Sequence, residues 1–319
     1  MIKKVLVFGA TGYLGRYMVL ASVAMGHLTY AYTRPLGLLG VSHNDPKLKT
    51  LLNFKALGVT IIEGELDDHE KLVSILQEVQ IVISALPVPQ YLDQLKIIDA
   101  MKEANIERFI PSEFGCEADR VRALPPFQAL LDNKKRVRRA IEAANIPYTY
   151  ILGNIMAGYF IHYIFFHDEN CNEKVTVYGN GQTKVVWNYE KDVAAYTIRA
   201  AMDSRTLNKT VSCRPLKNIA SLFDVISSWE IKTAKYLNKV HMLEEDVLKL
   251  TTETMPQEIS IPMSILHCIF IKGDPLSIEL KEDELEASDL YLDYKYTSID
   301  ELLNICTVDP PIVTLSRFV

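Results

Sequence analysis

The first fifteen residues constrain the fold of this chain more than any other stretch. An apolar run from Val5 to Phe8 is followed by Gly9, Gly12 and Gly15, and then by the helix-forming residues 16–25. This order predicts a strand, a tight turn and a helix. Glycine suits the turn because a Cβ would block a bend with positive φ and keep a pyrophosphate away from the amides at the helix N-terminus. The spacing differs from the commonest dinucleotide fingerprint, so its context between strand and helix carries the signal.

Alternation of apolar strands and helical stretches predicts an α/β fold, a Rossmann-type doubly wound parallel sheet. The expected strands are 5–8, 29–33, 59–62, 81–85, one that begins at 108, and 148–152. Beyond residue 158 the pattern indicates a smaller mixed α/β portion. We therefore predict an NADP-binding Rossmann domain over residues 1–157, with its sheet completed by later segments, and a mainly substrate-binding portion over 158–319.

Composition narrows the classes of partner. The chain has 34 Lys and Arg against 40 Asp and Glu, a net charge of −6, and no block of like charge, which disfavours nucleic acid and anionic membranes. Its five cysteines form no Cys-x-x-Cys pair, and its histidines show no metal-ligand spacing. No cleavable leader and no membrane-length apolar run are visible. We expect a cytoplasmic protein with a small-molecule partner and no metal, and leave open whether it is a homodimer.

The second predicted strand ends at Arg34, where Rossmann folds select their cofactor. An acidic residue there holds the ribose 2′-hydroxyl of NAD, whereas an arginine accommodates the 2′-phosphate of NADP. Arg34 therefore predicts NADPH. The alternative is an ordinary solvated charge at the end of a strand.

Two further positions follow a predicted strand at the edge that should face the cofactor. Residues 86–91 come after strand 81–85, and their prolines end it. The carboxyl ends of parallel strands face the ligand crevice, so Val88 and Tyr91 are candidate pocket residues. An ordinary surface loop explains them equally well.

Lys134 is the candidate for proton transfer, which commonly accompanies hydride transfer. It lies in the first half of the helix expected over 127–144, and a partly buried lysine has a lowered pKa that lets its amine act as a base. The alternative is a solvated basic face, because Lys135, Arg136, Arg138 and Arg139 follow. Short-chain dehydrogenases carry a tyrosine four residues before such a lysine, but here Leu130 stands there.

Several motifs resemble one plant reductase family over nearly the whole chain. They are Gly9-Ala-Thr-Gly-Tyr-Leu-Gly15, Thr33-Arg-Pro35, Gly64-Glu-Leu66, Pro111-Ser-Glu-Phe-Gly115, Arg122-Ala-Leu-Pro-Pro-Phe127, Asn133-Lys134 and Leu266-His-Cys-Ile-Phe-Ile-Lys-Gly273. These are similar to motifs of the pinoresinol-lariciresinol, isoflavone and phenylcoumaran benzylic ether reductases, which are NmrA-like atypical short-chain dehydrogenases. Ala144-Asn-Ile-Pro-Tyr-Thr149 and Asp309-Pro-Pro311 most resemble the eugenol and isoeugenol synthase branch.

The resemblance implies a reaction and a role for Lys134. Members of the family lack the tyrosine and carry a lysine at this position. The branch reduces a coniferyl ester, typically the acetate, with NADPH. Lys134 would take the proton of the para-hydroxyl, so that acetate leaves and a quinone methide forms. Hydride addition at the benzylic carbon gives eugenol, and addition at the terminal side-chain carbon gives isoeugenol.

The resemblance also implies site residues. Cofactor contacts carried over are Gly9, Thr11, Gly12, Tyr13, Leu14, Gly15, Arg34, Pro89, Gln90, Tyr91, Glu113, Phe114, Gly115, Lys134, Asn154, Ile155 and Met156. The expected substrate pocket comprises Val88, Tyr91, Met156, Tyr159, Tyr163 and Ile265, although core packing explains the last four equally well. Relatives often place a second basic residue soon after the arginine; here the nearest are Lys47 and Lys49.

The small Val88 and the aromatic Tyr91 match the pattern of isoeugenol-forming relatives, so isoeugenol is the predicted product. The alternatives are a eugenol synthase, a benzylic ether or isoflavone reductase, and a non-catalytic NADP-sensing regulator of the NmrA type.

Overall fold

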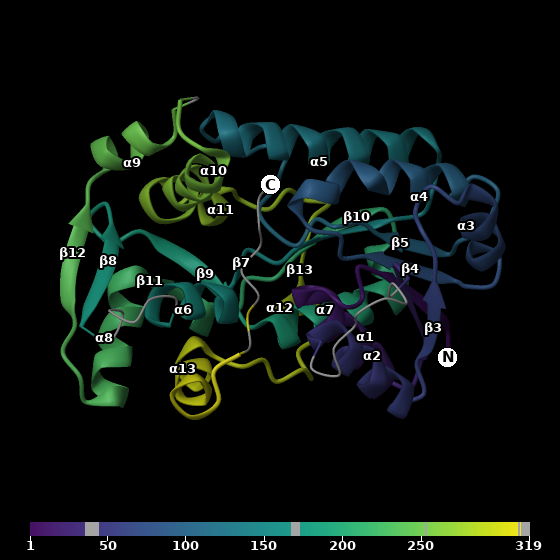
Figure 1. The fold of residues 1–319 in the computed structure, drawn as a ribbon, viewed down its shortest axis with the longest axis horizontal. Coiled ribbons are helices and arrows are strands. Elements are labelled where there is room, and N and C mark those ends of the chain that lie inside the picture. The colour runs from purple at the N-terminus through teal and green to yellow at the C-terminus, as the bar shows by residue number, and fades with distance from the viewer. Residues whose placement is uncertain (36–44, 167–172, 253, 312, 314–319) are drawn as a thin grey trace. The chain divides into compact units, whose positions relative to one another are not determined.

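The computed structural model describes residues 1–35, 45–166, 173–252, 254–311 and 313, and its chain forms two compact units (Figure 1). The first unit comprises Met1–Glu113, Asn133–Ile151 and Ala194–Val211. The second comprises Phe114–Asp132, Leu152–Val193 and Ser212–Val319. The two units thus alternate along the sequence, whereas the predicted domains divide it once, after residue 157.

Buried hydrogen bonds explain why residues 194–211 belong to the first unit. Arg108, which is 5% exposed, donates to the side chains of Thr149 and Thr206 at 2.7 and 2.9 Å. It also donates to the main-chain oxygens of Ala200 and Asp203, both at 3.3 Å. A buried guanidinium needs such partners, because an unpaired buried charge is costly. The later segment therefore completes the environment of Arg108, the first residue of a strand at the edge of the parallel sheet.

The first unit is built on a five-stranded sheet of order β3-β2-β1-β4-β5, in which every pair is parallel. This confirms the predicted α/β Rossmann-type class. The strands are β1 (Lys4–Phe8), β2 (Leu28–Thr33), β3 (Thr60–Glu63), β4 (Ile81–Ser84) and β5 (Arg108–Ile110). Residues 5–7 are 0% exposed, as expected of a parallel strand covered on both faces.

Helices and short elements complete the first unit. They are α1 (Tyr13–Ala24), α2 (Pro46–Ala56), α3 (His69–Leu76), the 3₁₀ helix η1 (Val88–Asp93), α4 (Gln94–Met101), α5 (Pro125–Ala143) from residue 133 onward, η3 (Ser204–Thr206) and β10 (Lys209–Ser212). Apolar side chains from α3, α4 and α5 form one core cluster with those of β1 and β4. Residues 88–91, for which the sequence left a surface loop as one alternative, lie in the 3₁₀ helix η1.

The predicted sixth strand forms as β6 (Thr149–Leu152), but placing it in the central sheet was wrong. Its link to β5 is one bridge, between Phe109 and Tyr148, with the Phe109 amide donating to the Pro147 oxygen at 2.8 Å. Pro147 has no N–H to extend this ladder. Strand β6 instead neighbours β10.

The second unit is mixed α/β. Strands β7 (Ile155–Met156), β9 (Lys184–Asn188) and β11 (Ile219–Ser221) form one sheet, and β8 (Lys174–Tyr178) and β12 (Asn238–Met242) form a parallel pair. Its other elements are α6 (Ala157–Phe165), the start of α7 (Glu190–Met202), η4 (Leu216–Asn218), α8 (Leu222–Thr233), α9 (Glu244–Leu250), α10 (Gln257–Leu266), the π-helix η5 (His267–Lys272), α11 (Asp274–Ser277), β13 (Leu285–Glu286), α12 (Ala287–Leu290) and α13 (Ile299–Val308). Within the described ranges, no helix is both long and apolar enough to cross a bilayer.

The turn between β1 and α1 has the geometry that its glycines predict. Gly9 has φ +70°, and its oxygen accepts the Gly12 amide at 2.9 Å. A Cβ on Gly9 would lie 2.6 Å from the Ala85 oxygen, and one on Gly15 would lie 2.0 Å from the Gly9 oxygen. The first glycine therefore lets the turn pass the end of β4, and the last lets α1 start against the turn.

Two glycine-to-alanine variants separate backbone strain from this close approach. Gly58 has φ +80° but open space around its missing Cβ. We expect Gly58→Ala to lower the free energy of unfolding by about 1–2 kcal/mol, the cost of left-handed backbone. Gly9→Ala should cost a further 1–3 kcal/mol or so, because its Cβ meets main chain that must move.

Urea titrations followed by circular dichroism measure both changes. Equal losses in the two variants would show that the approach of Ala85 does not require glycine at position 9.

Candidate functional site

The N-terminus of α1 is suited to bind a phosphate. Its N-cap is Gly12, in extended conformation, and its first turn carries no acidic side chain. Glycine at the N-cap provides no side chain to cap the helix. The positive end of a helix dipole attracts anions, and glycines without a Cβ let one approach the main chain. The turn is compatible with the pyrophosphate of a dinucleotide, and the contacts at Gly9, Thr11, Gly12, Tyr13, Leu14 and Gly15 stay a prediction.

Arg34 is exposed directly after β2, with Lys47 beside it. The Lys47 Nζ donates to the Arg34 oxygen at 3.0 Å. Burial and the Arg34 charge lower the pKa of Lys47. Lys49 is exposed on α2. The structure thus places Lys47 next to the residue predicted to meet the 2′-phosphate.

Lys134 is buried among other predicted site residues. It lies on α5 and is 6% exposed, and its Nζ donates to the main-chain oxygen of Glu113. The same Nζ lies 5.0 Å from the centroid of the Tyr91 ring on η1. Three predicted residues from η1, α5 and the segment after β5 therefore converge. If Lys134 moves a proton, as the sequence predicts, it would do so from this cluster in the first unit.

Glu113 is also held by a cation that the sequence analysis did not single out. Arg138 Nη2 lies 2.6 Å from Glu113 Oε2, and the two side chains are 3% and 1% exposed. Arg138 follows Lys134 by one helical turn, whereas Arg136 and Arg139 are exposed. The solvated-face alternative is therefore wrong for Lys134 and Arg138. Their i, i+4 spacing, which puts two cations on one helix face, was the available signal.

Gln94 is a second residue that the sequence analysis missed. It is 2% exposed at the start of α4. Its Oε1 accepts the Ser112 amide at 2.8 Å, and its Nε2 donates to the Tyr91 oxygen at 3.0 Å. Ser112 Oγ in turn donates to the Leu86 oxygen at 2.7 Å. One buried amide thus ties η1 to the segment that carries Glu113.

Three other predicted site residues, Val88, Pro89 and Gln90, precede Tyr91 on η1. Val88 and Gln90 are half-buried and Pro89 is exposed. Gln90 departs from helical geometry, with φ −111° and ψ 16°. A half-buried Val88 one turn from Tyr91 is compatible with a pocket wall.

The second unit brings two other predicted segments together. Phe114 and Asn154 both have positive φ, and the Asn154 amide donates to the Gly115 oxygen at 3.2 Å. The Asn154 side chain donates to the Cys213 oxygen at 2.8 Å. Ile155 and Met156 follow as β7. The segment 114–115 thus contacts Asn154, the residue that precedes β7.

Aromatic pocket candidates of the second unit lie on α6. Tyr159 and Tyr163 are half-buried, and the Tyr163 hydroxyl lies 3.4 Å from that of Tyr178. Tyr163 and Ile265 pack against the apolar core of this unit, in agreement with the core alternative. The Glu190 carboxylate accepts the amides of Gly158 and Tyr159 at 3.1 and 2.9 Å, and so caps the start of α6.

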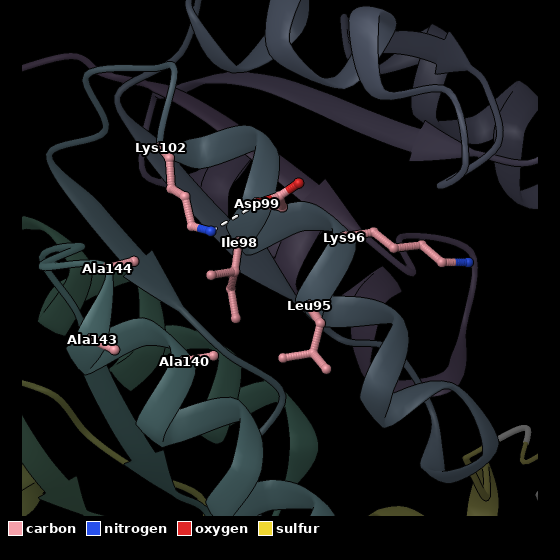
Figure 2. Close-up of a pocket in the computed structure, with 8 residues that line it drawn as sticks. All are labelled: Leu95, Lys96, Ile98, Asp99, Lys102, Ala140, Ala143 and Ala144. Atoms are coloured by element: carbon pink, nitrogen blue, oxygen red, sulfur yellow. Dashed lines mark hydrogen bonds and ion pairs between the residues drawn. The ribbon is translucent and has the colours of Figure 1, made fainter.

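A pocket of about 520 Å³ lies elsewhere, between α4 and α5 (Figure 2). Apolar side chains and an Asp99–Lys102 ion pair of 2.8 Å surround it; the lining residues are Leu95, Lys96, Ile98, Asp99, Lys102, Ala140, Ala143 and Ala144. None of the predicted site residues lines this pocket. It therefore adds nothing to the site around Lys134.

Comparison with known proteins gives a consistent set of relatives. The sequence pattern of the NmrA-like family matches residues 1–303. The chain is 54% identical to isoeugenol synthase 1 of Petunia hybrida over 317 residues, which cover 99% of this chain and 97% of that protein. It is 48% identical to isoeugenol synthase 1 of Clarkia breweri over 308 residues, 95% of each chain.

Solved structures agree with these relatives. One from a study of pinoresinol-lariciresinol and phenylcoumaran benzylic ether reductases superposes with a TM-score of 0.88 at 41% identity, covering 95% of this chain and 98% of that one. The complex of leucoanthocyanidin reductase with NADPH from Vitis vinifera gives 0.86 at 30% identity, covering 94% and 98%.

The bridge made by Gln94 can be tested through stability. Gln94→Leu removes the partner of the buried Ser112 amide and should lower the free energy of unfolding by about 1–3 kcal/mol. Gln77→Leu is the control, because the Gln77 side chain makes an exposed bond to the Glu103 oxygen. We expect a change within about 0.5 kcal/mol for this surface substitution.

Urea denaturation of both variants gives the comparison. A Gln94→Leu variant as stable as the control would contradict the bridging role.

Proposed function

The chain belongs to the NmrA-like family, and from this premise we propose that it is an NADPH-dependent phenylpropene synthase that reduces a coniferyl ester, coniferyl acetate, to isoeugenol with release of acetate. The observation that carries the proposal is the buried Lys134 amine, held by Glu113 and facing the ring of Tyr91. Two isoeugenol synthases among the relatives, covering almost the whole chain, supply the substrate class.

The residues that follow β1 and β2 are suited to bind NADPH. The N-terminus of α1, which follows the N-cap Gly12, would hold the pyrophosphate, and Arg34 with Lys47 would meet the 2′-phosphate. When bound, NADPH supplies the hydride. The residues carried over from the family at 89–91, 113–115 and 154–156 would complete its binding site.

Lys134 would hold and move the proton of the substrate para-hydroxyl. A neutral amine has two N–H groups and one lone pair. The bond to the Glu113 oxygen uses one N–H and helps to orient Nζ, and the lone pair would accept the phenolic proton. Transfer of the proton to Lys134 makes the phenolate, whose electrons expel acetate and form the quinone methide. The same amine returns the proton to the reduced product.

Val88 and Tyr91 would set where the side chain of the substrate lies. Both belong to η1, which Gln94 ties to the segment after β5. A small residue at 88 and an aromatic ring at 91 would place the terminal side-chain carbon, not the benzylic carbon, at the reacting position. Such a choice depends on a displacement of a few ångströms in a fixed site.

Product analysis with a lysine variant tests the proposal. Wild-type protein incubated with coniferyl acetate and NADPH should give isoeugenol by gas chromatography. Lys134→Met should lower kcat/KM by about 10²–10⁴-fold, because proton transfer is lost. The neighbouring Lys135→Met is the control and should retain activity.

Each other outcome has a meaning. Eugenol as the main product would overturn the regiochemistry, and turnover of a phenylcoumaran but not of the ester would favour a benzylic ether reductase. Unchanged activity of Lys134→Met would refute the role of the amine.

The pocket assignment is tested by exchanging the two side-chain sizes. The double variant Val88→Phe with Tyr91→Ile should shift the eugenol-to-isoeugenol ratio toward eugenol by about tenfold, in keeping with what a change of pocket shape can discriminate. Tyr91→Phe keeps the ring and should keep isoeugenol as product. A constant ratio in all three proteins would show that η1 does not place the side chain.

A further inference from the structure

Lys134 and Arg138 use different atoms of the same residue. The Lys134 Nζ donates to the main-chain oxygen of Glu113, and the Arg138 guanidinium pairs with its carboxylate at 2.6 Å. The two donors are one turn apart on α5, so the helix presents both to the segment after β5. Glu113 thus offers its uncharged main-chain oxygen to Lys134 and its charged carboxylate to Arg138.

Burial makes this separation consequential. Side chains 3% and 1% exposed are screened little by solvent, so the charge of Glu113 acts strongly on any neighbouring titratable group. Without Arg138, the uncompensated Glu113 carboxylate would favour the ammonium form of Lys134, whose Nζ contacts the same residue. A lysine held as an ammonium has no lone pair to accept a phenolic proton.

Other titratable groups around the cluster come from three elements. Tyr91 of η1 faces the Lys134 amine, and Tyr150 of β6 lies under the Arg138 guanidinium, 4.6 Å from its centre. The Tyr150 hydroxyl meets Glu142 of α5 at 3.2 Å, and burial raises the pKa of Tyr150. The charges of Glu113 and Arg138 lie in the same buried cluster as the Lys134 amine.

We propose that Arg138 is a positioning residue for the reaction proposed above: it neutralises the Glu113 carboxylate, so that Glu113 orients the Lys134 amine through its main-chain oxygen without holding a proton on it. Arg138 would act on Lys134 through Glu113, with which it pairs. The inference rests on the proposed function for its chemistry, but the charge state of Lys134 can be measured without substrate.

The test follows the titration of Lys134 by NMR, in the full-length protein labelled with ¹³C at lysine Cε. The signal is assigned by its loss in Lys134→Met. In Arg138→Met the pKa of Lys134 should rise by about 1–3 units, the effect of an uncompensated opposite charge nearby. In Glu113→Gln it should fall, because the Arg138 charge is then unopposed. The double variant Glu113→Gln with Arg138→Met should titrate within about half a unit of wild type.

The pH profile of kcat/KM gives an independent readout. Its acid limb should move to higher pH in Arg138→Met by the shift seen in the NMR titration. Arg136 is an exposed cation on the same helix, and Arg136→Met should change neither the pKa of Lys134 nor the acid limb of the profile. If Arg138→Met does not fold, the opposite shift in Glu113→Gln and the recovery in the double variant decide the matter.

The outcomes separate the two proposals. Equal titration of Lys134 in all variants, or the same shift in the single and double variants, would overturn the role of Arg138. The predicted NMR shifts in a protein that turns over no coniferyl ester would leave this role standing and refute the proposed function.

Discussion

Everything around Lys134 depends on a buried carboxylate that already has a partner. Glu113 lies after the last strand of the central sheet, and its charge is matched by Arg138 inside the protein. Burying such a pair costs desolvation, and removing one member leaves a buried charge that destabilises the structure strongly. A residue that is held in this way makes a rigid acceptor. Its main-chain oxygen can then fix the direction of a flexible lysine side chain.

The parallel sheet brings these groups to one edge. The glycine turn follows β1, Arg34 follows β2, η1 follows β4 and Glu113 follows β5. Parallel strands end on the same side, so the parts of a site that are far apart in sequence are gathered there. Gln94 and Ser112 then join the loops after β4 and β5 by hydrogen bonds. The parallel strands bring these loops close together, and the buried Gln94 side chain fixes the position of η1 relative to the segment after β5.

The sequence predicted the parts of the structure that local patterns determine. The glycine spacing and the apolar run at 5–8 predicted a strand, a turn and a helix, and the alternation of strands and helices predicted a parallel sheet. Sheet membership of β6 was not predictable in this way, because it depends on a pairing with β10 about sixty residues later. The roles of Arg138 and Gln94 were not predicted from the sequence, for a similar reason. A basic run and a polar helix start are typical of exposed surface, and only tertiary contacts bury them.

The alternation of the two units along the chain has a consequence for synthesis. The polypeptide passes from one unit to the other after residues 113, 132, 151, 193 and 211, so neither unit is a continuous stretch. The nascent first unit still lacks the partners of Arg108 at 200–206 when its sheet has emerged from the ribosome. Long-range closure of this kind slows folding and lengthens the time during which apolar strands are exposed. We therefore expect this chain to depend more on chaperones during synthesis than a protein whose two domains are continuous in sequence.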